Sequence, residues 1–445
     1  MKKELVALSI IFILSCSVYF LYLAPKPNYF KSKESPISSD YIKLCALNYE
    51  WFESWGGSND DDGYDIVLDD EGNIYIVGIT SSFGAGGRDV FLVKYDHFGN
   101  QLWNKSWGGG ASDLGYGVVI DNNSFIYITG ATNSIGIGNY DAFLVKFDST
   151  GNYLWNETWG GIDPDYSYGI ALDDSGNIYV SGITESYGTG SGAFFLVKYD
   201  TMRNQLWNKT WGNSRTDWRS SLVADETGNI YVSGTTEGIG AGLFDAYLAK
   251  YNSTGGLLWS QTWGRSSNDW GDGLTVDKNG NTYITGTTTS STGLDTFLVK
   301  FNSAGTQIWD EFWEGSSNDY GHGITQFDGT QIYITGYTES FGNGGDGFII
   351  KYDANGMELW SELWGGSSFE YGKGIIADEQ GDIYITGTTN SFGAGQRDAL
   401  FIKINEDISL EISFGNYHII IFLLSTISLV YYIWMRKKFK FEIIN

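Results

Sequence analysis

The chain is poor in several residue types, and each scarcity argues against a class of protein. Its 445 residues include two cysteines, Cys16 and Cys45, so no disulfide framework holds the fold together. Four prolines and a charged fraction of 18%, set against 42% hydrophobic residues, exclude a disordered chain. The 53 acidic residues outnumber the 27 basic ones, and a net charge of −26 argues against nucleic acid, because nothing neutralises a phosphate backbone.

Catalytic motifs are also scarce. The chain has three histidines, His97, His322 and His418. It has no serine–histidine–aspartate set, no zinc-protease helix motif, no cysteine–histidine pair and no Walker-type phosphate loop. The sequence therefore favours a binding protein over an enzyme, and it predicts no cofactor.

Tryptophan, in contrast, is abundant and periodic. A pair of tryptophans four residues apart occurs seven times. The second member of the pair stands at Trp55, Trp107, Trp159, Trp211, Trp263, Trp313 and Trp364. Successive positions are 50 to 52 residues apart. A fixed period of this size is the signature of a repeat architecture.

Each repeat is predicted to form four strands. In residues 63–108 the apolar runs "GYDIVL", "NIYIVGITSS", "VFLVKY" and "QLWNKSW" are separated by Gly, Asn and Asp turns. Short aromatic and β-branched runs between such turns are typical of an antiparallel meander. No stretch within the repeats has a 3.6-residue apolar period of helical length, so the fold class is all-β.

A four-stranded sheet repeated at this period is the blade of a β-propeller. Residues 46–57 match only the last strand of a repeat, whereas the final unit, 367–405, lacks that strand. The sequence therefore predicts a seven-bladed β-propeller of four-stranded antiparallel blades over residues 46–410. The N-terminal strand completes the last blade.

The tryptophan pairs are predicted to hold neighbouring blades together. Residues four apart on a strand point to the same face. In a propeller that face packs against the next blade, and each buried aromatic side chain contributes about 2–3 kcal/mol. We interpret the pairs as structural rather than as ligand contacts.

The repeat unit at residues 165–200 resembles the bacterial and archaeal SBBP β-propeller repeat. The matching elements are D-[YW]-G-x-G, D-x-x-G-N-[IT]-Y-[IV]-[TSV]-G-x-T, D-A-F-[LI]-V-K-[YF]-D and LWxxxWGG. The resemblance covers residues 46 to about 405. It implies a propeller and a surface or secreted protein, and it implies no common reaction.

Two acidic features recur in the repeats. The turns of the type Asp69–Asn73 are predicted to be hairpin turns, with calcium binding as the alternative.

A second acid begins the first strand of each unit, at Asp61, Asp113, Asp165, Asp217, Asp269, Asp319 and Glu370. We expect loop amides to hold these carboxylates, with a cation-collecting rim as the alternative. Calcium is thus the one possible cofactor.

Function is predicted where the repeats diverge. Three residues after each acid the chain has Tyr64, Tyr116, Tyr168, Ser220, Asp272, His322 and Lys373. With their aromatic neighbours, the candidate ligand-binding residues are Tyr64, Tyr116, Tyr168, Trp218, Trp270, Asp272, Tyr320, His322 and Lys373. Mixed aromatic and charged groups at one mouth are typical of a binding site, although drift among exposed loop positions would give the same pattern.

Both ends of the chain differ from the repeats. Residues 1–25 contain a twenty-residue apolar run behind two lysines and are predicted to be a signal anchor, with a linker at 26–45. Residues 417–435 are a second predicted transmembrane helix, followed by a basic tail at 436–445. The positive-inside rule places that tail in the cytoplasm and the propeller outside the cell.

Together these features predict a membrane-anchored extracellular propeller that acts as a non-catalytic scaffold. Its loop-bearing face would bind an extracellular protein or glycan, and nucleic acid is not expected. The alternative is a hydrolase or lyase acting on polysaccharide, with acidic residues at the channel mouth. Asp272, His322 and Lys373, in successive repeats, are the candidate acid–base cluster for that alternative.

Overall fold

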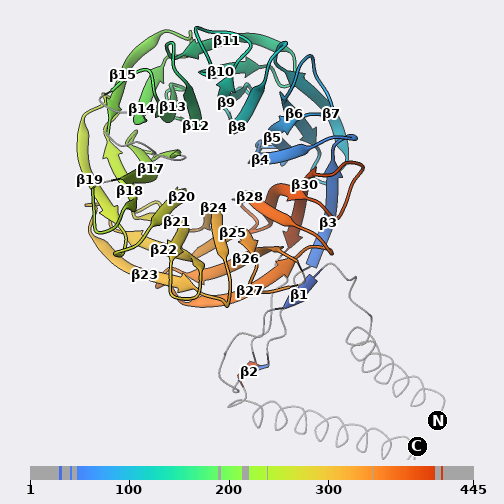
Figure 1. The fold of residues 1–445 in the computed structure, drawn as a ribbon, viewed down its shortest axis with the longest axis vertical. Coiled ribbons are helices and arrows are strands. Elements are labelled where there is room, and N and C mark those ends of the chain that lie inside the picture. Colours follow the sequence, from blue (N-terminus) through green and yellow to red (C-terminus); the bar gives the residue numbers. More distant parts are fainter. Residues whose placement is uncertain are drawn as a thin grey trace, which may run out of the picture.

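The computed structural model describes residues 48–405, except 189–191, 213–219, 238 and 343, together with three short strands at 30–32, 41–42 and 412–413. Within these residues the chain forms seven sheets arranged in a ring (Figure 1). Each sheet is an antiparallel meander whose strands follow one another from the central axis to the rim. The predicted seven-bladed, all-β propeller is confirmed.

The first four blades follow the order of the chain. Blade 1 contains β4 (Asp61–Leu68), β5 (Ile74–Thr80), β6 (Asp89–Tyr95) and β7 (Gln101–Trp107). Blade 2 contains β8 (Asp113–Ile120), β9 (Ile126–Thr132), β10 (Asp141–Phe147) and β11 (Tyr153–Trp159). Blade 3 contains β12 (Asp165–Leu172), β13 (Ile178–Thr184), β14 (Ala193–Tyr199) and β15 (Gln205–Trp211). Blade 4 contains β16 (Ser220–Ala224), β17 (Ile230–Glu237), β18 (Phe244–Tyr251) and β19 (Leu257–Trp263).

The remaining blades complete the ring. Blade 5 contains β20 (Asp269–Val276), β21 (Thr282–Thr289), β22 (Leu294–Phe301) and β23 (Gln307–Trp313). Blade 6 contains β24 (Asp319–Phe327), β25 (Gln331–Thr338), β26 (Asp346–Asp353) and β27 (Glu358–Trp364). Blade 7 contains β28 (Glu370–Ala377), β29 (Ile383–Thr389), β30 (Asp398–Asn405) and, from the start of the chain, β3 (Asn48–Trp55).

The N-terminal strand closes the ring, as predicted. β3 pairs antiparallel with β30, with Trp51 opposite Lys403 and Trp55 opposite Ala399. The Trp51 ring lies 5.4 Å from Phe401. Blade 7 is therefore built from the two ends of the repeat region, and neither end can leave without breaking a sheet.

Part of the predicted linker at 26–45 is ordered as strands. β1 (Phe30–Ser32) pairs with the outer strand β27 and makes blade 6 five-stranded, and β2 (Tyr41–Ile42) pairs with β31 (Ile412–Ser413).

The predicted membrane segments at 1–25 and 417–435 lie outside the described residues. Among the residues that are described, no helix has the length and apolar character needed to cross a bilayer.

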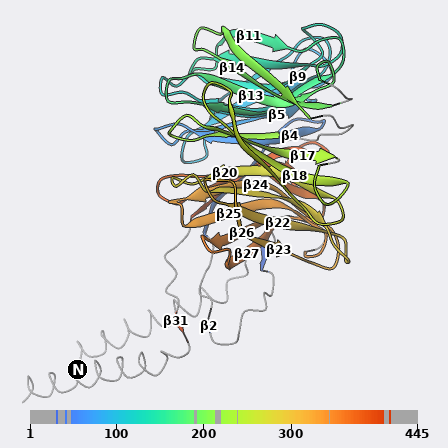
Figure 2. The same ribbon diagram turned by 90° about the vertical axis from the view of Figure 1, so that its left-hand side faces the viewer.

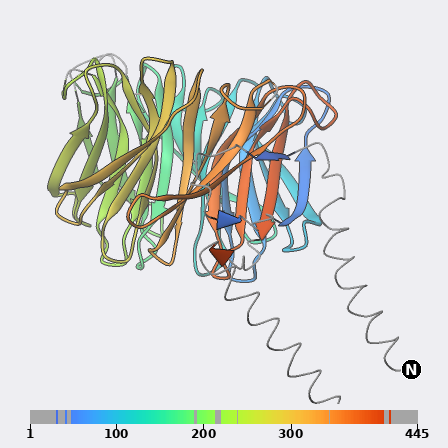
Figure 3. The same ribbon diagram turned by 90° about the horizontal axis from the view of Figure 1, so that it is seen from below.

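The strands run across the thickness of a flat disc, so the loops lie on two opposite faces (Figures 2 and 3). One face carries the loops that join one blade to the next, together with the loops between the second and third strands of each blade. The two kinds of loop touch: the backbone amide of Asn59, between β3 and β4, donates to Ser82 Oγ, between β5 and β6, at 3.0 Å. We call this side the loop face. The hairpin turns, such as Asp69–Asn73, lie at the opposite ends of the strands on the turn face.

The second tryptophan of each pair packs against the next blade, as predicted. Trp107 of blade 1 lies 4.5 Å from Phe143 of blade 2, and Trp159 lies 4.2 Å from Phe195 of blade 3. Trp55 closes the ring in the same way, 4.3 Å from Phe91 of blade 1. Each pair of blades thus shares one apolar cluster.

The first tryptophan of a pair packs under a hairpin turn of the next blade. A Cβ built on Gly99 would lie 3.1 Å from the Trp51 ring, and one on Gly305 would lie 2.8 Å from Trp259. Gly99 also has a φ of +83°, which side chains rarely tolerate. Glycine therefore meets two requirements there, a left-handed turn and close contact with an indole.

Removing one indole should weaken the whole ring. Trp313 is 1% exposed and its ring lies 4.7 Å from Phe348 of blade 6. We expect Trp313→Ala to cost about 3–5 kcal/mol, the usual loss for a buried aromatic residue, measured as a lower urea midpoint. Leu206→Ala, at a position that is 51% exposed on an outer strand, is the control. Equal midpoints for both variants would contradict the role of the indole.

Candidate functional site

The divergent residues of the repeats are β-bulges on the innermost strands. In blade 5 the pairing of β20 with β21 skips from Gly271 to Gly273, so Asp272 lies outside the register of the two strands. The same skip occurs in five other blades. The bulge residues are Tyr64, Tyr116, Tyr168, Asp272, His322 and Lys373. A bulge re-aims the extra side chain out of the regular alternation of the strand.

A glycine opposite each bulge makes this geometry possible. A Cβ on Gly286 would lie 1.9 Å from the carbonyl oxygen of Trp270, and one on Gly130 would lie 1.8 Å from that of Leu114. Real Cβ atoms do not approach a backbone oxygen that closely. The second strand therefore needs glycine where the first strand bulges toward it.

The bulge residues surround one central cavity of about 430 Å³. All six line it, together with Ser220 of blade 4 and Asp65 of blade 1. The innermost strands surround the axis of the ring (Figure 1), and the residues that line this solvent-open cavity belong to those strands. Side chains from all seven blades thus reach a single site.

One side of the cavity is aromatic. The rings of Tyr64 and Tyr116 lie 5.0 Å apart in an edge-to-face arrangement, and those of Tyr116 and Tyr168 lie 5.0 Å apart at 38°. These three residues come from blades 1, 2 and 3 in succession. We call them the tyrosine arc; their mutual contacts hold the rings as one wall.

The other side is polar and its charges are paired. His322 Nδ1 lies 3.0 Å from Asp272 Oδ2. Lys373 Nζ lies 3.7 Å above the Tyr64 ring and 3.6 Å from Asp62 Oδ1. We call Asp272, His322 and Lys373 the polar arc.

Asp62 supports the polar arc from the loop face. Burial opposes its ionisation, but the nearby charges of Lys373 and Arg397 outweigh burial and hold the pKa of Asp62 below its usual range. Arg397 also forms an ion pair with Asp60 at 2.8 Å. The Lys373 ammonium therefore faces an ionised carboxylate.

Asp65 is a cavity residue that the sequence analysis missed. It stands directly after a bulge, where the other described blades have glycine or, in blade 4, Ser221. Its carboxylate accepts the N–H groups of Ile66 and, across the blade interface, Val118, both at 2.9 Å. Burial raises the pKa of Asp65 to about 6. Alignment of the repeats at this glycine would have singled it out.

Two of the nine predicted residues, Trp270 and Tyr320, are not among the residues that line the cavity. Trp270 stacks on Phe244, with ring centroids 6.2 Å apart. Tyr320 lies 5.7 Å from Tyr337, nearer the loop face, although its ring is also 6.5 Å from His322. Trp218 lies outside the described residues.

Loop amides and hydroxyls hold the acids that begin the first strands, as expected. Asp113 accepts the Gly109 N–H at 2.8 Å, the Ser134 hydroxyl at 2.7 Å, and the Thr132 hydroxyl. Asp165 accepts the Gly161 N–H at 2.9 Å. Asp217 lies outside the described residues.

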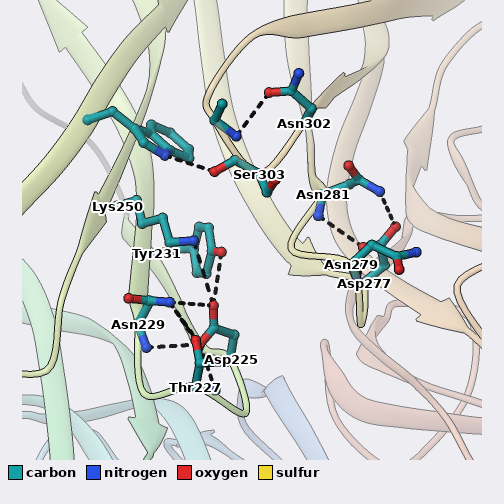
Figure 4. Close-up of polar contacts among 12 residues, drawn as sticks. Asp225, Thr227, Asn229, Tyr231, Lys250, Asp277, Asn279, Asn281, Asn302 and Ser303 are labelled. Atoms are coloured by element: carbon teal, nitrogen blue, oxygen red, sulfur yellow. Dashed lines mark hydrogen bonds and ion pairs between the residues drawn. The ribbon is translucent and has the colours of Figure 1, made fainter.

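The hairpin turns use their aspartates in the same way (Figure 4). Asp225 Oδ1 accepts the N–H groups of Thr227 and Asn229, and its Oδ2 accepts the Tyr231 hydroxyl at 3.0 Å. Lys250 Nζ lies 3.8 Å from the same oxygen. Each carboxylate thus orders its own turn. In the part of the chain that is described, no three His, Cys, Asp or Glu side chains gather as a metal site.

Comparison with known protein families finds a match in part of the repeat region. The model of the SBBP β-propeller repeat matches residues 51–84, 101–137, 258–293 and 360–393. These four segments therefore match the SBBP repeat, as the sequence resemblance indicated.

Other similarities are more distant. An uncharacterised WD repeat protein of Acanthamoeba polyphaga mimivirus is 24% identical to this chain over 200 residues, which is 35% of this chain. The regulatory protein FlaEY of Caulobacter vibrioides is 26% identical over 119 residues, which is 24% of this chain. The matches span 14% and 12% of those proteins. A solved ulvan lyase has a TM-score of 0.50 at 14% identity, covering 80% of this chain and 96% of that one. At such identity the likeness shows the fold alone.

The glycine opposite a bulge should be essential for the site. We expect Gly286→Ala to force β20 and β21 apart at Asp272 and to cost about 1–3 kcal/mol, the usual range for overpacking. Thermal unfolding by circular dichroism measures the loss. Gly110→Ala is the control, because no atom lies within 4 Å of its Cβ position. Equal melting temperatures for both variants would contradict the constraint.

Proposed function

We propose that this protein is a non-catalytic binding propeller whose central cavity holds a compact ligand or the end of a chain. One observation supports this most directly: six bulge residues of different chemistry project into one cavity of about 430 Å³. Ligand pockets usually measure about 300–1,000 Å³ and combine an apolar wall with a few polar groups. The tyrosine arc and the polar arc fit that description.

The repeats support this assignment by acting as controls for one another. Positions needed for folding are the same in every blade, such as the tryptophan pair and the glycine opposite the bulge. The bulge residue instead changes from tyrosine to aspartate, histidine and lysine around the ring, and in blade 4 the cavity residue is Ser220, which pairs with Gly234. A position that the fold leaves free is where a particular ligand can be selected.

We propose further that the propeller is displayed outside the cell and tethered to the membrane. The support is the sequence of the chain ends: an apolar run within 1–25, a second at 417–435, and basic residues at 436–445. A glycan or a protein at the cell surface is then the partner. Calcium binding stays a prediction.

Catalysis on a polysaccharide is the second candidate function. The observation that favours it is the pair formed by His322 and Asp272 inside the cavity. A carboxylate that holds an imidazole orients it and makes it a better base. A lyase needs such a base to remove the proton beside a uronate carboxyl group as the glycosidic bond breaks.

Separate replacement of the polar arc distinguishes the two functions. The full-length chain and its Asp272→Asn, His322→Gln and Lys373→Met variants are tested on a glycan array and for cleavage of the same glycans. Binding should occur without cleavage, and each variant should weaken it by about 3–30-fold, because each removes one polar contact. Cleavage that His322→Gln abolishes would establish the enzyme instead. No retention of any glycan or surface protein would refute both.

A further inference from the structure

We propose that the cavity ligand is an uncharged carbohydrate, a proposal that rests on the binding function above. The tyrosine arc would stack against the C–H face of a sugar ring, while the polar arc and Ser220 would reach its hydroxyl groups. Stacking and hydroxyl recognition are both available in one cavity only because the two arcs face each other across it.

The charges of the cavity favour an uncharged ligand. Asp272 is already paired with His322, and Lys373 with Asp62. Asp62 is held by Arg397 as well, at 3.7 Å. The Asp65 carboxylate accepts two backbone N–H groups. A charged ligand would have to break one of these contacts and leave a buried partner unpaired, which costs more than it gains.

The charge of the whole chain points the same way. A net charge of −26 repels uronate or sulfate chains before they reach the cavity. An aromatic wall, in contrast, binds a neutral sugar by contact area and is insensitive to that charge. The ligand class therefore differs from an acidic polysaccharide even though an ulvan lyase shares the fold.

Calorimetry with the full-length chain tests the ligand class. The probes are cellohexaose, maltohexaose and hexa-N-acetylchitohexaose as neutral sugars, with trigalacturonate and a chondroitin sulfate tetrasaccharide as acidic ones. We expect at least one neutral probe to bind with an affinity that changes less than threefold between 50 and 500 mM NaCl. Tyr116→Ala should weaken it at least tenfold, and Tyr153→Ala, half exposed on an outer strand, should not.

The outcomes separate the ligand class from the proposed function. If an acidic probe binds more tightly, loses affinity in salt and still depends on Tyr116, the cavity is a binding site but its ligand is charged. If no probe binds, or if binding ignores Tyr116, both the ligand class and the carbohydrate-binding cavity are refuted.

A second, independent feature lies between the blades. Among the described residues, six of the seven interfaces between blades contain a pair of buried acids. One acid stands at the start of the third strand of a blade, and the other stands at the start of the first strand of the following blade. The pairs are Asp398 with Asp61, Asp89 with Asp113, Asp141 with Asp165, Asp245 with Asp269, Asp295 with Asp319, and Asp346 with Glu370. At the interface of blades 3 and 4 the third strand begins with Ala193 instead.

The two carboxyl groups of a pair converge on one glycine. A Cβ on Gly108 would lie 2.1 Å from Asp89 Oδ1 and 2.7 Å from Asp113 Oδ2. Gly56, Gly160 and Gly264 show the same arrangement between their own pairs, at 2.1 to 2.8 Å. Oxygens of both acids therefore lie on the same side of the same α-carbon, without a side chain between them.

One oxygen of the pair has no donor. Asp113 Oδ2 accepts an amide and a hydroxyl, and Asp89 Oδ2 accepts the amides of Ala85 and Gly86. Asp89 Oδ1, which faces the glycine, is buried and accepts no hydrogen bond from the described residues. Asp398 Oδ1, at the interface of blades 7 and 1, is likewise buried without a donor. Arg397, beside Asp398, is engaged with Asp60 and Asp62, while Arg265 faces Asp269 at its own interface.

We infer that these pairs each hold a proton when the protein is folded at mildly acidic pH. A proton on Asp89 or Asp398 removes the repulsion between two buried carboxylates and occupies the oxygen that has no donor.

The electrostatics of the acids agree with this inference. Burial first, and then the charge of the partner acid, raise the pKa of Asp89, Asp141 and Asp398 above the usual range. Burial raises the pKa of Asp319 to about 6. Because the folded pKa exceeds the unfolded one, the stabilisation is complete below about pH 4 and is lost as pH rises through the folded pKa.

Unfolding of the full-length chain in urea between pH 4.5 and 8 tests the inference. The midpoint should fall as pH rises from 5 to 8, opposite to the usual gain of a protein with salt-bridged carboxylates. Asp89→Asn should flatten this slope and raise the midpoint at pH 8 relative to the unchanged chain. Asp163→Asn, at an exposed loop position, should leave both unchanged.

Two results would overturn the inference. If Asp89→Asn lowers the midpoint at every pH, the pair is needed in its doubly ionised form. If EGTA lowers the midpoint of the unchanged chain at pH 8 and added calcium restores it, a cation rather than a proton neutralises the pair. A calcium effect that Asp89→Asn removes would locate that cation at the pair itself.

Discussion

The contact between a tryptophan and the aromatic third strand of the next blade is the interaction on which the structure depends. Each such contact buries an indole, as Trp107 does on Phe143, and contributes about 2–3 kcal/mol. The chain has no disulfide framework to add to it. Since β3 and β30 share a sheet, the ring has no free end from which blades can peel away.

The same repetition explains why the central cavity can be specific. Folding fixes the glycine opposite each bulge, because the backbone of the first strand passes too close for any side chain. It does not fix the bulge residue, which lies outside the register of the two strands. The side chain at such a position can therefore change without breaking the strand pairing of its blade, and six such positions around one axis can match one ligand.

The fold was predictable from the sequence, and the cavity was predictable in part. Strand pattern, blade number and closure follow from spacing, because every blade meets the same packing requirement. The six bulge residues were found because they differ between repeats. Trp270 was grouped with Asp272 as an aromatic neighbour, but it stacks on Phe244 and is not among the residues that line the cavity.

Asp65 and the inter-blade acid pairs were missed for a different reason. The acid that begins the third strand recurs in nearly every repeat, so it carries no signal of special chemistry, and its partner lies one blade further along. Only the closed ring brings Asp89 beside Asp113. At mildly acidic pH a count of acidic residues therefore overstates the negative charge that the propeller presents, because pairs of buried carboxyls that share a proton contribute one charge rather than two.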